Sequence, residues 1–221
     1  MVETEQKSDS YEYDIVTVTY HEENVVVEYP KLTNYHDEEK QEAINELIKT
    51  AAIKPYQDTI ASLDSDQKYE AEGSFEIKLK NEKILSIAYT SYNNVTPSAH
   101  PYHLFFTTNI DLNTGKQLFL TDFVSEIDND FIHTLKEAKY VGDIESEYEQ
   151  DIRNMAFGLY ENDEKLISEL TRSQEGTNGI YVYVTEDALG ISMPVAHVAG
   201  DHAEFEISIQ KLKERVKLDW N

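Results

Sequence analysis

Two short segments of this sequence bring histidines close enough together to bind a metal ion or to titrate near neutral pH. The first, His100-Pro101-Tyr102-His103, carries two imidazoles three residues apart, a spacing that binds metal when a helix places both on one face. Pro101 and the run Leu104-Phe105-Phe106 predict instead a loop that leads into a strand, where the two side chains point to opposite faces. We therefore expect a structural or hydrogen-bonded His100 rather than a metal ligand.

The second segment surrounds a glycine turn nearer the C-terminus. His197 and His202 flank Gly200-Asp201, so two imidazoles and a carboxylate could bind a metal or titrate together. An exposed loop is the simpler interpretation of these residues. We expect no metal and no cofactor, and a metal-dependent hydrolase built on His100 or His202 is the alternative from a different class.

Other catalytic signatures are missing from the chain. It has no cysteine, which excludes disulfides, thiolate metal sites and cysteine nucleophiles. It has no Gly-x-Ser-x-Gly motif and no glycine-rich loop of the kinds that bind phosphates or dinucleotides. Its 43 acidic residues supply so many carboxylate pairs that no single pair indicates glycoside hydrolysis. The sequence therefore predicts a protein that is not an enzyme.

The charge balance narrows the class of partner. The 221 residues contain 19 lysines and arginines against 43 aspartates and glutamates, a formal net charge of −24. Affinity for nucleic acid and for anionic membrane surfaces comes mostly from basic side chains, so neither partner is expected. Because 40% of the residues are apolar, the chain can still bury a sizeable core. A macromolecular partner is expected to be basic.

A hairpin and a long helix are expected in the first third of the chain. Residues 13–20 and 25–29 are rich in β-branched and aromatic side chains and predict two strands, the second ended by Pro30. Asn34 is the expected N-cap of a helix whose apolar residues recur at helical spacing from 44 to 63. Pro55 predicts a kink or break in this helix.

The remainder mixes strands with helical blocks. Helices are expected at residues 131–138, 144–159 and 164–170, and a last one starts at Gln210, before a Trp220 that could be exposed. The acidic run formed by Asp143, Glu145, Glu147, Glu149 and Asp151 predicts a solvated helix face. The expected strands are residues 69–80, 84–92, 103–112, 117–120, 180–184, 189–193 and 205–209, with a turn at 113–116.

These elements predict an α+β fold with a mainly antiparallel sheet packed against helices, because no regular alternation of strand and helix occurs. The helical pattern ends near residues 64–68, and we predict a boundary between two sequential subdomains there. Residues 11–66 would form a smaller hairpin-plus-helix region and 67–221 a larger α+β domain. Residues 1–10 are polar and are expected to be a flexible leader.

The order of several short motifs resembles the extracytoplasmic region of RsiV-type anti-sigma factors. The motifs cover nearly the whole chain: Tyr29–Leu32 and Ile44-Asn45, then Ala99-His100, Asn109–Lys116, Leu118–Phe123, Tyr183–Thr185, Leu189–Ile191, Phe205–Ile207 and Leu212. Where that family often has paired glycines before the alanine-histidine pair, this chain has Pro97-Ser98, so the turn there can differ.

The resemblance implies an extracytoplasmic sensing or binding module of a Gram-positive-type bacterium, anchored to the membrane in its full-length form. The RsiV ectodomain binds lysozyme, a basic protein, and the same kind of domain of unknown function occurs fused to peptidoglycan deacetylases. A lysozyme-like protein is therefore the implied partner, and a cell-wall glycan is the alternative. The residues expected to serve binding or structure are His100, Tyr102, His103, Asp111, Gly115, Asp201 and His202.

Overall fold

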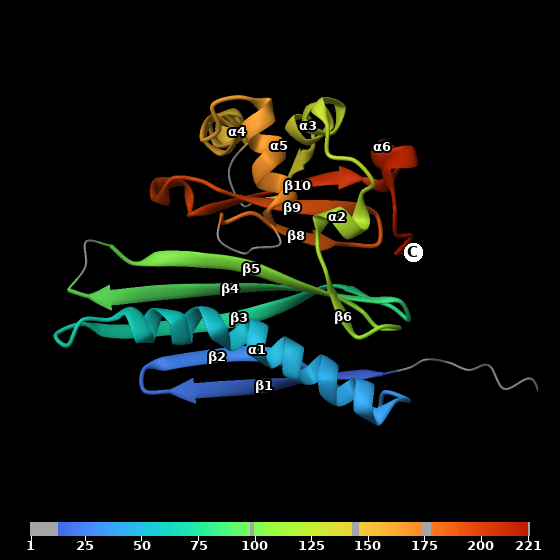
Figure 1. Cartoon of the computed structure of the whole chain (residues 1–221). Coiled ribbons are helices and arrows are strands. Elements are labelled where there is room, and N and C mark those ends of the chain that lie inside the picture. The colour runs from blue at the N-terminus through green and yellow to red at the C-terminus, as the bar shows by residue number, and fades with distance from the viewer. Residues whose placement is uncertain (1–12, 98–99, 143–145, 174–177, 221) are drawn as a thin grey trace, which may run out of the picture.

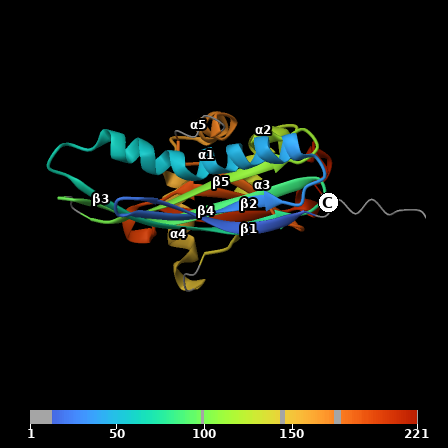
Figure 2. The same cartoon turned by 90° about the horizontal axis from the view of Figure 1, so that it is seen from below.

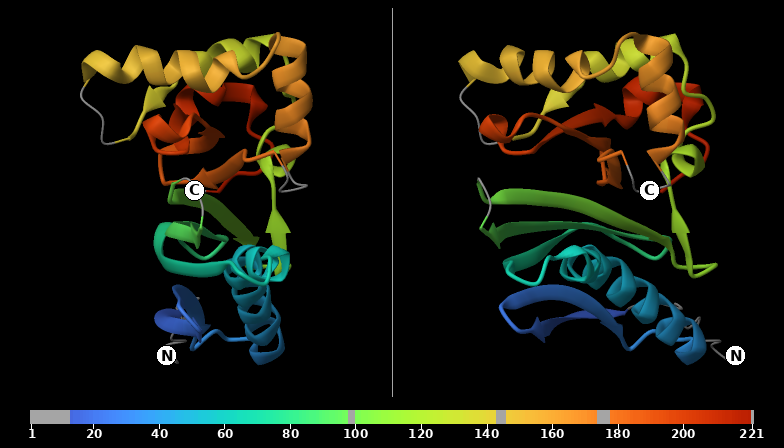
Figure 3. Two further views of the ribbon diagram at one scale, coloured as in Figure 1. Left: turned by 90° about the vertical axis from the view of Figure 1, so that its left-hand side faces the viewer. Right: turned by 60° about the vertical axis from the view of Figure 1, so that its left-hand side comes forward.

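The computed structural model describes residues 13–97, 100–142, 146–173 and 178–220, and within them it stacks two β-sheets between two helical layers. Figures 1 and 3 show the group of shorter helices beyond the small sheet and, on the other side of the small sheet, the large sheet, along which one long helix lies. Among the described strands the pairing is antiparallel except between residues 25–27 and 71–73, which pair in parallel. The predicted α+β class with mainly antiparallel sheet is therefore confirmed.

The chain begins with the predicted hairpin, which is longer than expected. β1 (Asp14–Glu22) pairs with β2 (Val25–Thr33) along its whole length. Pro30 does not end β2, and that prediction was wrong. Pro30 pairs with Thr17 of β1. On its other side β2 pairs with β3 only at Val25–Val27, so the missing N–H of Pro30 leaves no hydrogen bond between strands unmade there.

The long helix α1 (Glu38–Ser62) differs from the prediction at two points. Its N-cap is Asp37, whose carboxylate accepts the N–H of Lys40 at 3.0 Å, whereas Asn34 lies outside the helix with a left-handed φ of 59°. The helix also continues through Pro55 instead of breaking there. The buried face that α1 lays on the large sheet (Figure 2) offsets the cost of the proline.

The large sheet continues from the hairpin into the next four strands without interruption. These are β3 (Lys68–Lys80), β4 (Ile84–Thr96), β5 (Tyr102–Asp111) and β6 (Lys116–Leu118), in the order β1-β2-β3-β4-β5-β6. The link at residues 64–68 joins α1 to β3, and the sheet extends across it through the β2–β3 pairing. The division of the chain into two subdomains stays a prediction.

Alternation along β4 directs side chains to two different cores. Leu85, Ile87 and Tyr89 belong to the cluster that packs under α1. Ile84 and Ala88 point the other way, Ile84 into the core beneath the small sheet and Ala88 against Phe105 and Tyr183. The large sheet is thus covered by α1 on one face and, over part of the other face, by the small sheet.

The second half of the chain builds the small sheet and its helices. The sheet order is β7-β10-β9-β8, and its apolar face packs against α3, α4 and α5. Glu147 and Asp151 are exposed as predicted. Glu149 is half-buried and pairs with Arg153, and Asp143 and Glu145 lie outside the described residues. Among the described helices, none is both long and apolar enough to cross a membrane. The elements are α2 (Leu120–Phe123), α3 (Asn129–Lys136), β7 (Lys139–Tyr140), a 3-10 turn (Ser146–Tyr148), α4 (Glu149–Gly158), α5 (Asp163–Thr171), β8 (Tyr181–Val184), β9 (Ala188–Pro194), a 3-10 turn (His197–Ala199), β10 (His202–Ser208), α6 (Ile209–Leu212) and a 3-10 turn (Lys213–Arg215).

Trp220 is buried rather than exposed, which corrects the expectation for this terminal residue. Its indole N–H donates to the carbonyl of Thr185 at 3.0 Å, and its ring meets Phe123 edge-on at 5.5 Å. Its own carbonyl accepts the side-chain amide of Asn81 at 2.7 Å. The C-terminal segment therefore joins the small sheet to the β3–β4 turn of the large one.

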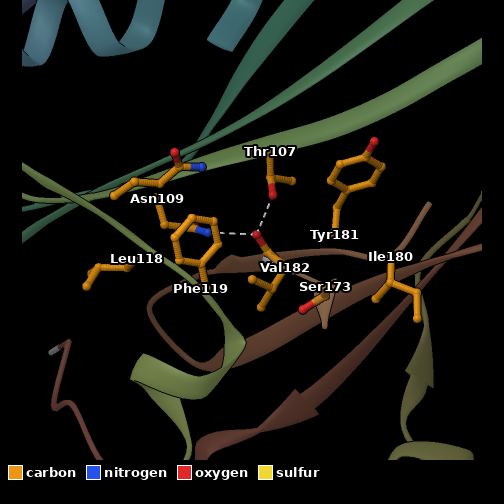
Figure 4. A pocket seen from close by; sticks show the side chains of 9 residues that line it. Thr107, Asn109, Leu118, Phe119, Ser173, Ile180, Tyr181 and Val182 are labelled. Carbon is orange, nitrogen blue, oxygen red and sulfur yellow. Dashed lines mark hydrogen bonds between the residues drawn. The ribbon is translucent and has the colours of Figure 1, made fainter. Parts of the chain in front are cut away.

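Side chains of the large sheet satisfy the outer backbone edge of β8 (Figure 4). The carbonyl of Val182 accepts hydrogen bonds from Thr107 Oγ1 at 2.5 Å and Asn109 Nδ2 at 2.8 Å. The N–H of Val184 donates to Ser86 Oγ at 3.1 Å, and that hydroxyl donates to Asn109 Oδ1 at 2.7 Å. We call Ser86, Thr107 and Asn109 the edge clamp. It gives the two sheets a fixed position along the strand direction.

Replacing Ser86 by alanine should lower the free energy of unfolding by about 1–3 kcal/mol, because the N–H of Val184 then stays buried without an acceptor. Urea denaturation measures the loss. Ser74→Ala is the matched control, since Ser74 is an exposed strand serine whose hydroxyl lies 3.3 Å from that of Thr90, and we expect a change of about 0.5 kcal/mol or less. Equal, small effects of both substitutions would contradict the edge clamp.

Candidate functional site

The structure brings the two histidine segments together. His103 and Asp201 are 98 residues apart in the chain, yet the backbone N–H of His103 donates to Asp201 Oδ2 at 2.7 Å. The rings of His100 and His197 stack with their centroids 5.9 Å apart. His100 precedes β5, which begins at Tyr102, so strand alternation does not separate it from His103. Both imidazoles reach the 197–201 turn.

Asp201 is the centre of this cluster. Its carboxylate lies 3.0 and 3.1 Å from His197 Nδ1 and 3.6 Å from His103 Nδ1, while its backbone carbonyl accepts the N–H of Val195. The turn needs two left-handed residues in succession, Gly200 at φ 96° and Asp201 at φ 72°. Aspartate tolerates that conformation better than most residues, which fits its place here. The carboxylate is thus held beside two imidazoles by the backbone itself.

His202 lies on the other side of the cluster, in the seam between the sheets. Its ring stacks on Phe105 at 4.7 Å, and its Nε2 is 3.7 Å from Glu204 Oε1. His202 and Glu204 occupy alternate positions of β10, so they share the face that is turned toward the large sheet, away from the apolar face of Ala203 and Phe205.

A lysine and a tyrosine complete the seam. Lys78 Nζ lies 3.8 Å from Glu204 Oε2 and 4.9 Å from the centroid of the Tyr183 ring, and the Tyr183 hydroxyl donates to Glu206 Oε1 at 3.2 Å. Burial raises the pKa of the Glu204 carboxyl, but the imidazole of His202 and the charge of Lys78 more than offset it, so the pKa lies below its usual value. Burial also raises the pKa of the Tyr183 hydroxyl, which therefore stays neutral.

Beyond the seam the large sheet carries an exposed row that ends at the histidine cluster. The strand register places Val26 beside Glu72, Glu72 beside Tyr92, and Tyr92 beside His103. Tyr92 is 42% exposed, and its ring meets that of His103 edge-on at 5.9 Å. We call Glu72, Tyr92, His103 and Asp201 the transverse row. It combines an aromatic ring, an imidazole and two carboxylates on one accessible surface.

Further carboxylates surround the transverse row on the same face of the sheet. Glu28, Glu70 and Glu76 are exposed, and by alternation they point away from α1 like Glu72. Lys78 lies 2.7 Å from Glu76 and is already engaged with Glu204 on its other side. The surface around Tyr92 is therefore predominantly acidic.

Three residues from the predicted set lie away from this surface. Asp111 accepts the N–H groups of Asn113 and Thr114 in the turn after β5, and Gly115 provides the left-handed φ of 69° that this turn requires. Tyr102 is on the α1 side of β5, because it alternates with His103. Asp111 and Gly115 thus form a turn, whereas His100, His103, Asp201 and His202 come together. Ala99, from the alanine-histidine pair, lies outside the described residues.

Within the described part of the chain, no group of three or more histidine, aspartate and glutamate side chains is arranged to hold a metal ion. What the transverse row can do is bind cationic groups with its carboxylates and stack against a flat or charged group with its aromatic ring. Tyr92, Glu72 and Glu204 were not among the residues predicted from the sequence. Alternation of acidic with apolar residues in residues 70–77 and 202–207 was the available signal for the two glutamates.

The comparisons with known proteins find a shared fold. No family model matches the chain, and no curated protein matches its sequence. The crystal structure of a member of the DUF3298 family from Bacteroides fragilis covers 93% of both chains with a TM-score of 0.52 at 12% identity. A DUF3298 family protein from Pseudomonas aeruginosa covers 95% of both chains at 17% identity, with a TM-score of 0.45. The chain is thus similar in fold to a DUF3298 domain, a class of uncharacterised domain.

The lowered pKa of Glu204 predicts a pH dependence of stability. Its ionised form stabilises the fold above about pH 4.3, the ordinary pKa of glutamate, and this contribution is lost as the pH falls through the lower folded-state value. Glu204→Gln should therefore be less stable than the parent at pH 7, with the difference shrinking as the pH falls below about 4.3. Urea titrations at several pH values measure it.

The control for this experiment is Glu72→Gln. It removes one negative charge from an exposed position on the face of the large sheet that points away from α1. It reports what the reduced net charge does by itself. A Glu204→Gln difference that grows on acidification would contradict the assignment of Lys78 and His202 as stabilising partners of ionised Glu204.

Proposed function

We propose that this chain is a non-catalytic binding domain that recognises a basic protein through the transverse row. The observation that carries the proposal is the exposed Tyr92, set between Glu72 and His103 on an acidic sheet face. Tyrosine is enriched among the residues that dominate binding energy at interfaces, because it brings a large rigid ring with a polar end.

Charge favours a basic partner over an acidic one. Glu28, Glu70 and Glu76 surround the row, and the whole chain carries −24. An acidic surface of this kind accelerates encounter with a cationic protein, and the Tyr92 ring can accept a lysine or arginine in a cation–π contact. Val198, 87% exposed at the tip of the adjoining turn, adds an apolar contact beside the polar ones.

The narrower form of the proposal is an extracytoplasmic sensing domain like that of RsiV-type anti-sigma factors, tethered to the envelope in its full-length form. The motif order in the sequence supports it. A lysozyme-like protein is then the first partner to test, since lysozyme is basic and its charge is opposite to that of the row.

A cell-wall glycan is the second candidate. The exposed ring of Tyr92 offers a stacking surface for a sugar, and the neighbouring Glu72, His103 and Asp201 offer hydrogen-bonding groups around it. This ligand is uncharged or weakly charged, so its binding would depend little on salt.

Calorimetric titration with hen lysozyme at about 50 and about 150 mM salt tests the first candidate, because exposed charge attraction is screened across this range. We expect saturable binding at both salts and a loss of about tenfold or more for Tyr92→Ala, equivalent to about 1.4 kcal/mol. Tyr148→Ala is the matched control, since Tyr148 is 51% exposed and lies before α4, on another layer.

Two results would refute lysozyme recognition through this row. Absence of binding at both salts would exclude lysozyme as the partner. Binding that disappears at the higher salt, or that Tyr92→Ala and Tyr148→Ala weaken equally, would indicate unspecific charge attraction.

For the glycan candidate, the protein is passed over insoluble peptidoglycan in moderate salt. Retention that persists in salt and is lost in Tyr92→Ala but kept in Tyr148→Ala is the expected result. Free passage of the parent protein through the column would exclude the glycan.

A further inference from the structure

Histidine stands at both ends of the transverse row. The strand register continues the row from Glu72 through Val26 to His21 of β1, while its other end is His103 of β5. Figure 1 shows β1 and β5 on opposite sides of β2, β3 and β4. Because directly opposite residues share a face of the sheet, His21 lies on the same open face as Glu72.

Four of the seven histidines of the chain lie along this row or at the turn where it ends, and all four are open to solvent. His21 and His100 are exposed, and the side chains of His103 and His197 are 52% and 50% exposed. We call His21, His100, His103 and His197 the histidine set. Histidine is the side chain that ordinarily changes its charge between pH 5 and pH 8, so this surface can gain positive charge within that range.

Carboxylates from three elements face the histidine set. They are Glu28 of β2, Glu70 and Glu72 of β3, and Asp201 of the turn before β10. Asp201 lies 3.0 Å from His197 Nδ1 and 3.6 Å from His103 Nδ1. Neighbouring strands are about 4.8 Å apart, so Glu72 is about 10 Å from each end of the row, which is about one Debye length at 0.1 M salt. Charges on the imidazoles therefore act directly on these four carboxylates.

Two lysines of β3 share this face of the sheet. Lys78 is engaged, because its Nζ lies 2.7 Å from Glu76 and 3.8 Å from Glu204. Glu204 also faces Nε2 of His202 at 3.7 Å, so a positive charge on His202 would be balanced in the seam. Lys68 is exposed at the start of β3 and, by alternation, adds one positive charge that is the same at neutral and at mildly acidic pH. The charge that varies on the open surface is thus that of the histidine set.

We propose that the histidine set makes recognition by the transverse row pH-dependent: the row binds cationic groups of a partner at neutral pH and releases them as the pH falls toward about 5.5. Four imidazolium charges would then offset the four carboxylates one for one, which removes the attraction. Aspartate and glutamate ordinarily titrate near pH 4, below this range, so the change comes from histidine. The inference rests on the proposed function, because it describes how binding by the same surface is regulated.

Two small nitroxides of opposite charge, an aminomethyl and a carboxy derivative of the same ring, test the row without a protein partner. The ratio of the NMR relaxation enhancements that the cation and the anion cause at a given proton reports the local electrostatic potential. At the Tyr92 ring protons of the full chain we expect this ratio to exceed one at about pH 7.5 and to fall about threefold or more at about pH 5.5. The ring protons of Tyr148, 51% exposed before α4, are the control in the same sample and should change less.

Replacing the whole histidine set by glutamine should abolish the fall of the ratio at Tyr92. The control variant combines His36→Gln and His133→Gln, at two exposed histidines away from the row, and should behave like the parent. An unchanged ratio in the parent, an equal fall at Tyr92 and Tyr148, or an equal fall in the glutamine variant would overturn the proposal. The first two of these tests use the unaltered chain, so they stand even where a variant fails to fold.

The affinity for hen lysozyme, which stays cationic across this range, tests the consequence for binding. We expect it to fall about tenfold or more from about pH 7.5 to about pH 5.5 in the parent, and less than about threefold in the glutamine variant. Equal affinity of the parent at the two pH values would overturn the proposal. Absence of lysozyme binding at both pH values would instead refute lysozyme as the partner, and the nitroxide ratio then decides whether the row responds to pH.

Discussion

The attachment of one sheet to the other depends on which groups form hydrogen bonds with the backbone N–H and C=O groups at the outer edge of β8. An edge strand buried against another sheet leaves backbone groups that must find partners, and here Ser86, Thr107 and Asn109 supply them through their side chains. Gly190 is part of the same constraint, since a Cβ there would lie 2.1 Å from the Tyr183 ring, which occupies the space between the sheets. Because these contacts fix where β8 sits on β4 and β5, they also fix β9 and β10. The turn that carries Asp201 consequently meets the start of β5.

In this position the small sheet covers only part of the large sheet. The small sheet reaches Ala88 and Phe105 but leaves Tyr92 and the glutamates of β3 open. The seam itself is polar, with Lys78, Glu204 and Tyr183 in mutual contact where two ordinary sandwich sheets would bury apolar side chains. Partial coverage thus produces a boundary between buried and exposed charge, and the transverse row ends at it.

The sequence predicted the elements better than their contacts. Alternation and helical spacing are local properties, so most strands, α1 and the α+β class could be found from residue order, as could the histidine segments themselves. The predictions based on Pro30 and Asn34 were wrong because residue propensities do not include tertiary context. Pro30 is tolerated on a side of β2 that has no partner strand there, and the carboxylate of Asp37 caps α1 in place of Asn34. Trp220 could not be placed, since its partners Thr185 and Phe123 come from distant parts of the chain. Asn109 stood in a recognisable motif, yet its bond to Val182 is visible only once the two sheets are stacked.

The transverse row recognises a partner through carboxylates and an aromatic ring, and this gives the net charge a more limited role. Attraction between exposed charges is screened by salt, so the part of the affinity that comes from the carboxylates depends on salt. A contact with the Tyr92 ring requires instead a group of suitable shape at one position of the partner. The charge of −24 therefore favours encounter with basic proteins, while the geometry of the row determines which of them remain bound.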